Sequence, residues 1–208
     1  MKIEINKHSS IKITCEKVIY FDPFGLETAQ HDADVIFVTH SHYDHLSPED
    51  IAKCAKADTV FVAPVSCGKD LEKHGFTNMV LMKAGEEKEI NGVLAEAVPA
   101  YNKLKPFHPK ANGWLGYVVT AEGEKVYVAG DTDALKENRE IGCDTALVPV
   151  GGMYTMNAKD AAAFINSMQV KPRKAIPTHY GSVVGKADDG GEFARLVDKD
   201  VKTELLIK

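Results

Sequence analysis

The fold is decided by the apolar run Val35-Ile36-Phe37-Val38, which is followed directly by Thr39-His40-Ser41-His42-Tyr43-Asp44-His45. The apolar run is short and rich in β-branched residues, so it predicts a buried strand. The polar residues then lie at the carboxyl end of that strand, where open α/β folds place their sites. Imidazole and carboxylate groups are ligands that suit zinc, iron and manganese. The stretch therefore predicts a metal site at the edge of a sheet.

The spacing within this motif separates its side chains into two pairs. His40 and His42 are two residues apart, so on an extended backbone they project to the same side. Asp44 and His45 come where the strand has become a loop, and can turn toward a second point. We expect each pair to hold one ion, with Asp44 also placed to shuttle a proton as a catalytic residue. The alternative is a polar loop of solvated histidines, which the dense H-x-H-x-D-H order disfavours.

The segment after the motif has the features of a helix start. Ser47 can cap the helix, and Pro48 is allowed at its first position. An acidic residue also follows a strand further along the chain, where Asp131 comes after the predicted strand Lys125 to Ala129. Gly130 lets the backbone turn there, so the Asp131 carboxylate is well placed to bind a metal.

The order His40-x-His42-x-Asp44-His45 resembles the signature of the metallo-β-lactamase superfamily, and the resemblance spans nearly the whole chain. It implies a mixed α/β (α+β) fold, a four-layer αββα sandwich, with a mono- or dinuclear metal site used mostly for hydrolysis. In the superfamily pattern, Asp131 matches the aspartate that bridges both metals, and His179 matches a ligand of the second metal. Asp22 matches a carboxylate that supports the ligand histidines from behind.

Two tyrosines near the predicted site have roles that the sequence leaves open. The segment Gly151-Gly152-Met153-Tyr154-Thr155-Met156 resembles small hydrolases close to the ascorbate-6-phosphate lactonase-like branch of the superfamily, which implies that Tyr154 lines the site. Tyr180 follows His179 directly. It either donates a hydrogen bond to a reacting oxygen or only packs.

The segment from Tyr101 to Lys110 departs from the superfamily pattern. That pattern implies a metal-binding histidine shortly after Pro99-Ala100, but the equivalent place holds Asn102. An amide carbonyl ligates metals only weakly compared with imidazole. The next histidine is His108, which could replace the missing ligand, contact the substrate or be an ordinary loop residue. We expect two ions if His108 is a metal ligand, and one ion if it is not.

The same segment carries Lys103, Lys105 and Lys110. It is either a solvated surface loop or a lid that attracts an anionic substrate, because lysine suits phosphate and carboxylate groups. The polar run from Glu86 to Glu89 is expected to be a solvated connection. Near the end of the chain we expect a helix from Glu192 to Val197 and a strand from Thr203 to Ile207.

Composition limits the possible functions. The 208 residues suit one domain spanning 1–208, and a net charge of −5 makes nucleic acid an unlikely partner. No apolar stretch approaches the length needed to cross a bilayer, so no membrane partner is expected. Four scattered cysteines without a Cys-x-x-Cys pair favour free thiols in a reducing compartment, and we expect a cytoplasmic protein.

These observations predict a hydrolase that uses one or two divalent ions. Zinc is favoured, with manganese or iron as alternatives. The expected substrate is a small, anionic ester, lactone or phosphodiester, attacked by a metal-bound hydroxide. Two other functions stay open: a non-catalytic protein that binds a metal or ligand, and an iron-based oxidoreductase like flavodiiron proteins. The sequence leaves the substrate, the metal and the oligomeric state undecided.

Overall fold

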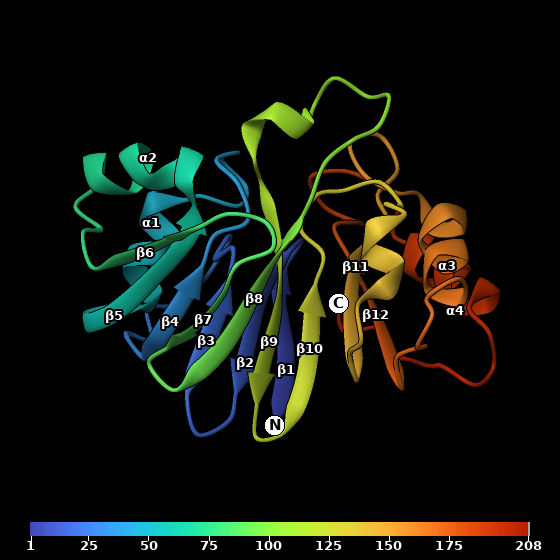
Figure 1. Cartoon of the computed structure of the whole chain (residues 1–208), viewed down its shortest axis with the longest axis horizontal. Helices are drawn as coiled ribbons and strands as arrows, with labels where there is room; N and C mark the ends of the chain where they lie inside the picture. The colour runs from blue at the N-terminus through green and yellow to red at the C-terminus, as the bar shows by residue number, and fades with distance from the viewer. Residues whose placement is uncertain (208) are drawn as a thin grey trace.

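Alternating apolar residues build two β-sheets that face one another, with helices on the outer side of each (Figure 1). The computed structural model describes residues 1–207. The first sheet has the strand order β1-β2-β3-β4-β5-β6. Its strands are β1 (Lys2–Lys7), β2 (Ser10–Thr14), β3 (Val18–Phe21), β4 (Ala33–Phe37), β5 (Ala55–Pro64) and β6 (Met79–Met82).

The second sheet has the order β13-β12-β11-β10-β9-β8-β7. Its strands are β7 (Glu87–Ile90), β8 (Val93–Pro99), β9 (Leu115–Ala121), β10 (Glu124–Val128), β11 (Thr145–Pro149), β12 (Lys174–Thr178) and β13 (Lys202–Thr203). The helices are α1 (Pro48–Cys54), α2 (Gly68–Lys73), α3 (Ala158–Asn166) and α4 (Asp189–Leu196), with short 3-10 turns η1 (Val65–Cys67), η2 (Lys110–Asn112) and η3 (Glu137–Glu140).

Three apolar cores hold the layers together. The central core lies between the sheets and includes Ile13, Phe37 and Val119, all fully buried. A second core joins the second sheet to α3 and α4, and a third joins the first sheet to α1 and α2. Burying both faces of each sheet requires this four-layer arrangement. The structure confirms the predicted αββα sandwich, and the layers are visible in Figure 1 with α1 and α2 on one side and α3 and α4 on the other.

The parallel strands place their carboxyl ends toward the site. Strands β3 to β6 are parallel to one another in the first sheet, as are β10 to β13 in the second. Helix α1 begins as predicted, because the Ser47 side chain accepts a hydrogen bond from the Asp50 backbone N–H and Pro48 is its first residue. The motif loop is therefore fixed between a buried strand and a capped helix.

Three sequence-based expectations about elements need correction. The run Glu86 to Glu89 is not merely a connection, because Glu87–Ile90 forms the edge strand β7, paired antiparallel with β8. Charged residues are common on edge strands, where they discourage pairing with other chains. The last strand, β13, ends at Thr203, and α4 begins at Asp189, earlier than expected. Within residues 1–207, no helix has the length and apolarity needed to span a bilayer.

Candidate metal centre

Asp131 lies at the centre of the histidine cluster. Its side chain is almost fully buried, and its Oδ2 atom is 3.0 Å from His179 Nε2, 3.2 Å from His108 Nε2 and 4.0 Å from His40 Nε2. Its Oδ1 atom is 3.4 Å from His45 Nε2. Asp131 follows Gly130, whose φ of +64° and close contact with the Leu115 carbonyl leave no room for a Cβ atom. One carboxylate therefore faces four histidines.

The first group of side chains around Asp131 consists of His40, His42 and His108, whose ring nitrogens lie close enough to share one ion. His40 Nε2 is 3.0 Å from His42 Nδ1. His40 and His108 are buried and His42 is half-buried, and the Trp114 ring packs against all three. The loop after β4 and the loop after β8 supply this group.

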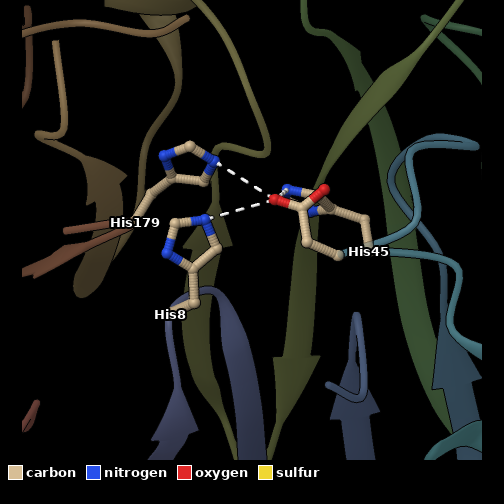
Figure 2. A group of neighbouring side chains, drawn as sticks. His8, His45 and His179 are labelled. Carbon is tan, nitrogen blue, oxygen red and sulfur yellow. Dashed lines mark ion pairs between the residues drawn. The ribbon is translucent and has the colours of Figure 1, made fainter. Parts of the chain in front are cut away.

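The second group consists of Asp44, His45 and His179, together with His8, which the sequence analysis did not identify. His8 Nε2 lies 3.3 Å from Asp44 Oδ2, and His179 Nε2 lies 3.9 Å from the same oxygen. Figure 2 shows the His8 and His179 rings side by side, with His45 across from them. The four side chains come from the β1–β2 turn, the motif loop and the end of β12.

Several of these residues adopt a backbone conformation that non-glycine residues rarely use. The φ angles are +58° at His8, +46° at Asp22 and +61° at His179. Such left-handed conformations cost free energy and persist where surrounding contacts hold them. The backbone N–H of His179 donates to the carbonyl of His8, which ties the β1–β2 turn to the end of β12. At these three positions the left-handed backbone lies where the side chains of the cluster converge.

Asp22 and Thr39 orient the motif histidines from behind. Asp22 Oδ2 lies 2.7 Å from His45 Nδ1 and accepts a hydrogen bond from the Thr39 hydroxyl. Because that hydroxyl donates to Asp22, it can accept from His40 Nδ1, 3.0 Å away. Each ring then has its Nε2 atom turned toward Asp131. This is how a supporting carboxylate or hydroxyl fixes the tautomer of a ligand histidine.

Asn102 orients His108 and does not join the cluster. Its Oδ1 atom accepts from the His108 backbone N–H and lies 3.0 Å from His108 Nδ1. An amide oxygen can only accept, so His108 Nδ1 carries the hydrogen and Nε2 faces Asp131. The Asn102 amide nitrogen donates to the Tyr154 carbonyl and to Asp133. Of the alternatives that the sequence left open, the structure places His108 at the cluster and Asn102 behind it.

Charges in the cluster shift the pKa values of its members. Burial alone would lower the pKa of His45, but Asp131, Asp22 and Asp44 outweigh it and raise that pKa to about 9. Burial would raise the pKa of Asp44, yet the adjacent His8 side chain and the charge of His45 hold it at about 2. Burial holds the pKa of His40 well below its usual value. At neutral pH Asp44 is a carboxylate and His40 is neutral, as metal ligands must be.

The donor atoms fit a divalent metal. Within the described residues, five buried atoms of the cluster lack a hydrogen-bond partner: His8 Nε2, His45 Nε2, His108 Nε2, Asp131 Oδ1 and His179 Nδ1. Leaving such atoms unpaired is costly, and a cation would satisfy them. Imidazole nitrogen and carboxylate oxygen are the donors that zinc prefers. The residues present therefore suit a pair of ions that share Asp131.

A cavity of about 440 Å³ opens onto the cluster. The lining includes His42, Asp44, His108, Asp131 and His179 together with Tyr43, Phe107, Tyr154, Val183 and Val184. Tyr154 thus lies in the pocket wall, as the resemblance implied. Tyr180 does not line this pocket. Its ring is buried in the core beneath α4, with its hydroxyl close to Gly190, so the packing alternative describes it.

None of the three lysines between Tyr101 and Lys110 lines the pocket, and two of them have partners elsewhere. Lys105 Nζ is 3.0 Å from Asp133 and donates to the carbonyls of Gly152 and Thr155. Lys110 Nζ lies over the Tyr101 ring, 4.8 Å from its centroid. Neither lysine faces the pocket, which removes the basis for the expected attraction of an anionic substrate.

His8 was missed because no local pattern distinguishes a histidine in a hairpin turn. The topology does contain a signal. Strand β2 runs antiparallel to β3, so its first residues lie beside the end of β3, next to Asp22. A histidine in the β1–β2 turn therefore falls at the same edge as the motif. A larger cavity of about 850 Å³ lies along β1 and β2, and in the part of the chain that the structure describes it has only His8 in common with the cluster.

Two facing sheets with a histidine–aspartate cluster at their strand ends define the metallo-β-lactamase class, and comparison with known proteins agrees. The family model described as "Beta-lactamase superfamily domain" matches residues 19–180. This chain belongs to that superfamily and, more particularly, to the UPF0173 metal-dependent hydrolases. It is 32% identical to the Thermococcus onnurineus member over all of this chain and 96% of that relative. The Thermus thermophilus member is also 32% identical, over 96% of this chain and 92% of that relative.

Solved structures show the same fold. A Parabacteroides distasonis protein, also designated a metal-dependent hydrolase, is 30% identical, with a TM-score of 0.84 over 99% of this chain and 93% of that chain. CmlA from Streptomyces venezuelae, a diiron β-hydroxylase, is 16% identical, with a TM-score of 0.77 over 99% of this chain and 52% of CmlA. The CmlA likeness concerns the fold alone. This chain is thus a metal-dependent hydrolase by family.

Proposed function

We propose that this protein hydrolyses a small ester, lactone or phosphodiester with two divalent ions, most simply zinc, that share Asp131. The observation that carries the proposal is the position of this one buried carboxylate, with its oxygens facing both groups of ligands. Lactones are among these substrates because Gly151 to Tyr154 resembles the lactonase-like branch of the superfamily, to which we propose that the protein belongs. The four free cysteines in the described chain are consistent with the cytoplasmic location that we propose.

The chain's own residues would divide the work between the two halves of the cluster. His40, His42 and His108 would hold one ion, and Asp44, His45 and His179 the other. Bound zinc supplies Lewis acidity and makes a bound water acidic near neutral pH. Asp22, Thr39 and Asn102 would keep the ligand nitrogens turned inward. Holding the ligands in place in this way avoids reorganisation during the reaction.

Asp44 is the residue we propose to handle protons. Its side chain is 11% exposed, more than that of any other second-group residue, and it lines the pocket. Asp44 is ionised at neutral pH, and from its place in the pocket it would take a proton from the attacking water and pass it to the leaving oxygen. His8 Nε2 contacts the same Asp44 oxygen as His45 Nε2, and in this role His8 would hold the orientation of the carboxylate.

Elemental analysis and a hydrolysis panel together test the proposal. Purified protein loaded with zinc should carry about two ions per chain and hydrolyse at least one member of a set of lactones, thioesters, phosphodiesters and β-lactams. Asp131→Asn should remove at least one ion and the activity, while Leu104→Ala, at a fully exposed position outside the pocket, should change neither. Two bound ions without turnover on any substrate would favour the non-catalytic alternative. Iron as the bound metal, with substrate oxidised and not hydrolysed, would favour the oxidoreductase.

A further inference from the structure

We propose that the pocket beside the metal centre selects substrates in which the group next to the scissile bond is uncharged and apolar, such as an aryl or branched alkyl group. The inference rests on the proposed function, because the ions would hold the scissile bond itself. It narrows the substrate class and reverses the preference for anions that the lysine-rich segment suggested. The argument depends on the pocket wall, which lies outside the cluster.

Apolar side chains form that wall. Phe107 and Tyr154 pack edge to face, with ring centroids 4.6 Å apart, and Val183 and Val184 complete the lining beside them. Phe107 is 40% exposed and Val183 is 37% exposed. Single exposed apolar residues are ordinary, but here they gather at the mouth of one pocket, which is a mark of a ligand-binding surface. A bound apolar group would cover this surface.

The charges around the wall disfavour an anionic group. Over residues 1–207, no lysine or arginine lines the pocket, and the charged side chains that do line it are Asp44 and Asp131. A carboxylate placed against this wall, away from the ions, would find no lysine or arginine side chain to pair with. Burying a charge without a partner is costly, whereas an apolar group gains free energy from leaving water.

The lysine-rich segment builds this wall and does not bind the ligand. Lys105 joins its own loop to the carbonyls of Gly152 and Thr155, and Asn102 donates to the carbonyl of Tyr154. The loop that carries Phe107 and the loop that carries Tyr154 are therefore fixed to each other. A rigid aromatic wall needs no ordering when the ligand binds, which preserves binding free energy. A cavity of about 440 Å³ suits a small-molecule ligand.

Hydroxamates separate the metal centre from the wall, because the hydroxamate group chelates the ions and its substituent occupies the pocket. We would measure binding to the zinc-loaded protein by calorimetry for acetohydroxamate, phenylacetohydroxamate and succinate monohydroxamate. Phenylacetohydroxamate should bind about tenfold more tightly than acetohydroxamate, because its ring is buried against the wall. Succinate monohydroxamate should bind no more tightly than acetohydroxamate.

Variants at the wall sharpen the test. Phe107→Ala should remove most of the advantage that phenylacetohydroxamate has over acetohydroxamate. Leu104→Ala is the matched control, since Leu104 lies in the same segment but is 97% exposed. Val183→Lys adds a cation at the rim and should invert the preference, so that the carboxylate-bearing compound binds more tightly than the phenyl one.

The possible failures can be told apart. If succinate monohydroxamate binds the wild-type protein as tightly as phenylacetohydroxamate or more tightly, the inference about the wall is wrong while the metal centre stands. An equal phenyl advantage in Phe107→Ala would also overturn it. If none of the three compounds binds the zinc-loaded protein, the proposed metal function fails and the inference fails with it.

Discussion

The two halves of the cluster are built in different ways. The first group, His40, His42 and His108, takes two members from one strand end and the third from a long loop. The second group, Asp44, His45 and His179, takes members from two separate strand ends, and the β1–β2 turn lies against it. His42 is half-exposed, whereas His45 is fully buried. The second group also includes a carboxylate, Asp44, in addition to the shared Asp131.

This difference predicts unequal metal affinities. The second group is held by Asp22, by the turn at His8 and by left-handed backbone at His179, so its donors are fixed before the metal arrives. Extra negative charge from Asp44 strengthens its attraction for a cation. The first group takes His108 from a long loop, in which Asn102 holds the His108 backbone and ring. We therefore expect the second group to fill first when metal is scarce.

Of these predictions, removing one ligand from either group should change the metal content per chain the most. His108→Ala should lower the metal content from about two ions to about one, because a site with three histidines loses a third of its donors. His179→Asn should also leave about one ion, but in the other half. Asparagine is chosen because it tolerates the φ of +61° at this position.

Cobalt substitution distinguishes the two variants, because the absorption spectrum reports the ligands of the ion that remains. The cobalt spectra of His108→Ala and His179→Asn should differ, and that of His108→Ala should match wild type loaded with a single equivalent. Identical spectra in the two variants would contradict the division into two groups. A wild-type protein that binds only one ion would contradict it as well.

Substitution of Asn102 should have a smaller effect, on the metal affinity of the first group. Asn102→Ala removes the acceptor that fixes the His108 ring, so the affinity of the first group should fall by about 10- to 100-fold, the usual effect of losing a supporting hydrogen bond. The second group should be unchanged. Asn102→His should not help, because the structure already gives His108 the place of a ligand. If the metal content instead rises only in Asn102→His, the first site of the wild-type protein is degraded.

Substitution of His8 tests how this residue contributes to metal binding by the second group. His8→Asn keeps a residue that tolerates the φ of +58° but is too short to reach Asp44. If His8 orients Asp44, the affinity for the more tightly bound ion should fall by about tenfold while two ions still bind. Loss of one whole ion would instead make His8 a ligand. Ser182→Ala is a control, since the Ser182 hydroxyl is 3.5 Å from His8 Nδ1 on the other side of the ring.

The parts of the site that sequence predicted share one property: each follows a strand closely. His40 to His45, Asp131 and His179 lie within a few residues of β4, β10 and β12, so a local pattern places them at one edge. The four-layer fold was predicted from the superfamily resemblance and not from local pattern. The superfamily resemblance then supplied the expected roles, which local pattern alone does not give.

The parts that sequence left open depend on contacts between distant segments. Asn102 and His108 lie in a loop without periodicity, and their roles follow from hydrogen bonds within that loop and to Tyr154. The lysines of this loop suggested an anion site because sequence does not show that Lys105 is already bound to Asp133 and two carbonyls. His8 lies more than 30 residues before the motif, and only the strand order brings it there.

The smallest expected effect concerns the stability of the metal-free protein. The pKa of His45 is about 9 in the folded state and 6.5 without the fold, so its stabilising contribution is complete below pH 6.5 and is lost as pH rises through 9. The free energy of unfolding should fall by about 2 kcal/mol between pH 6.5 and 8.5, measured by denaturant titration in the presence of a chelator. Staying below pH 8.5 avoids a second loss of stability, since burial raises the pKa of Cys54, Cys67 and Cys143 from 9.0 to about 12.

In the metal-loaded protein the ion replaces the proton on His45, and stability should stay level or rise over the same window. Asp22→Asn should flatten the metal-free curve, because Asp22 is one of the charges that raise this pKa. A metal-free curve that is already flat in the wild type would mean that His45 is neutral without metal, and the second group would then bind its ion without displacing a proton.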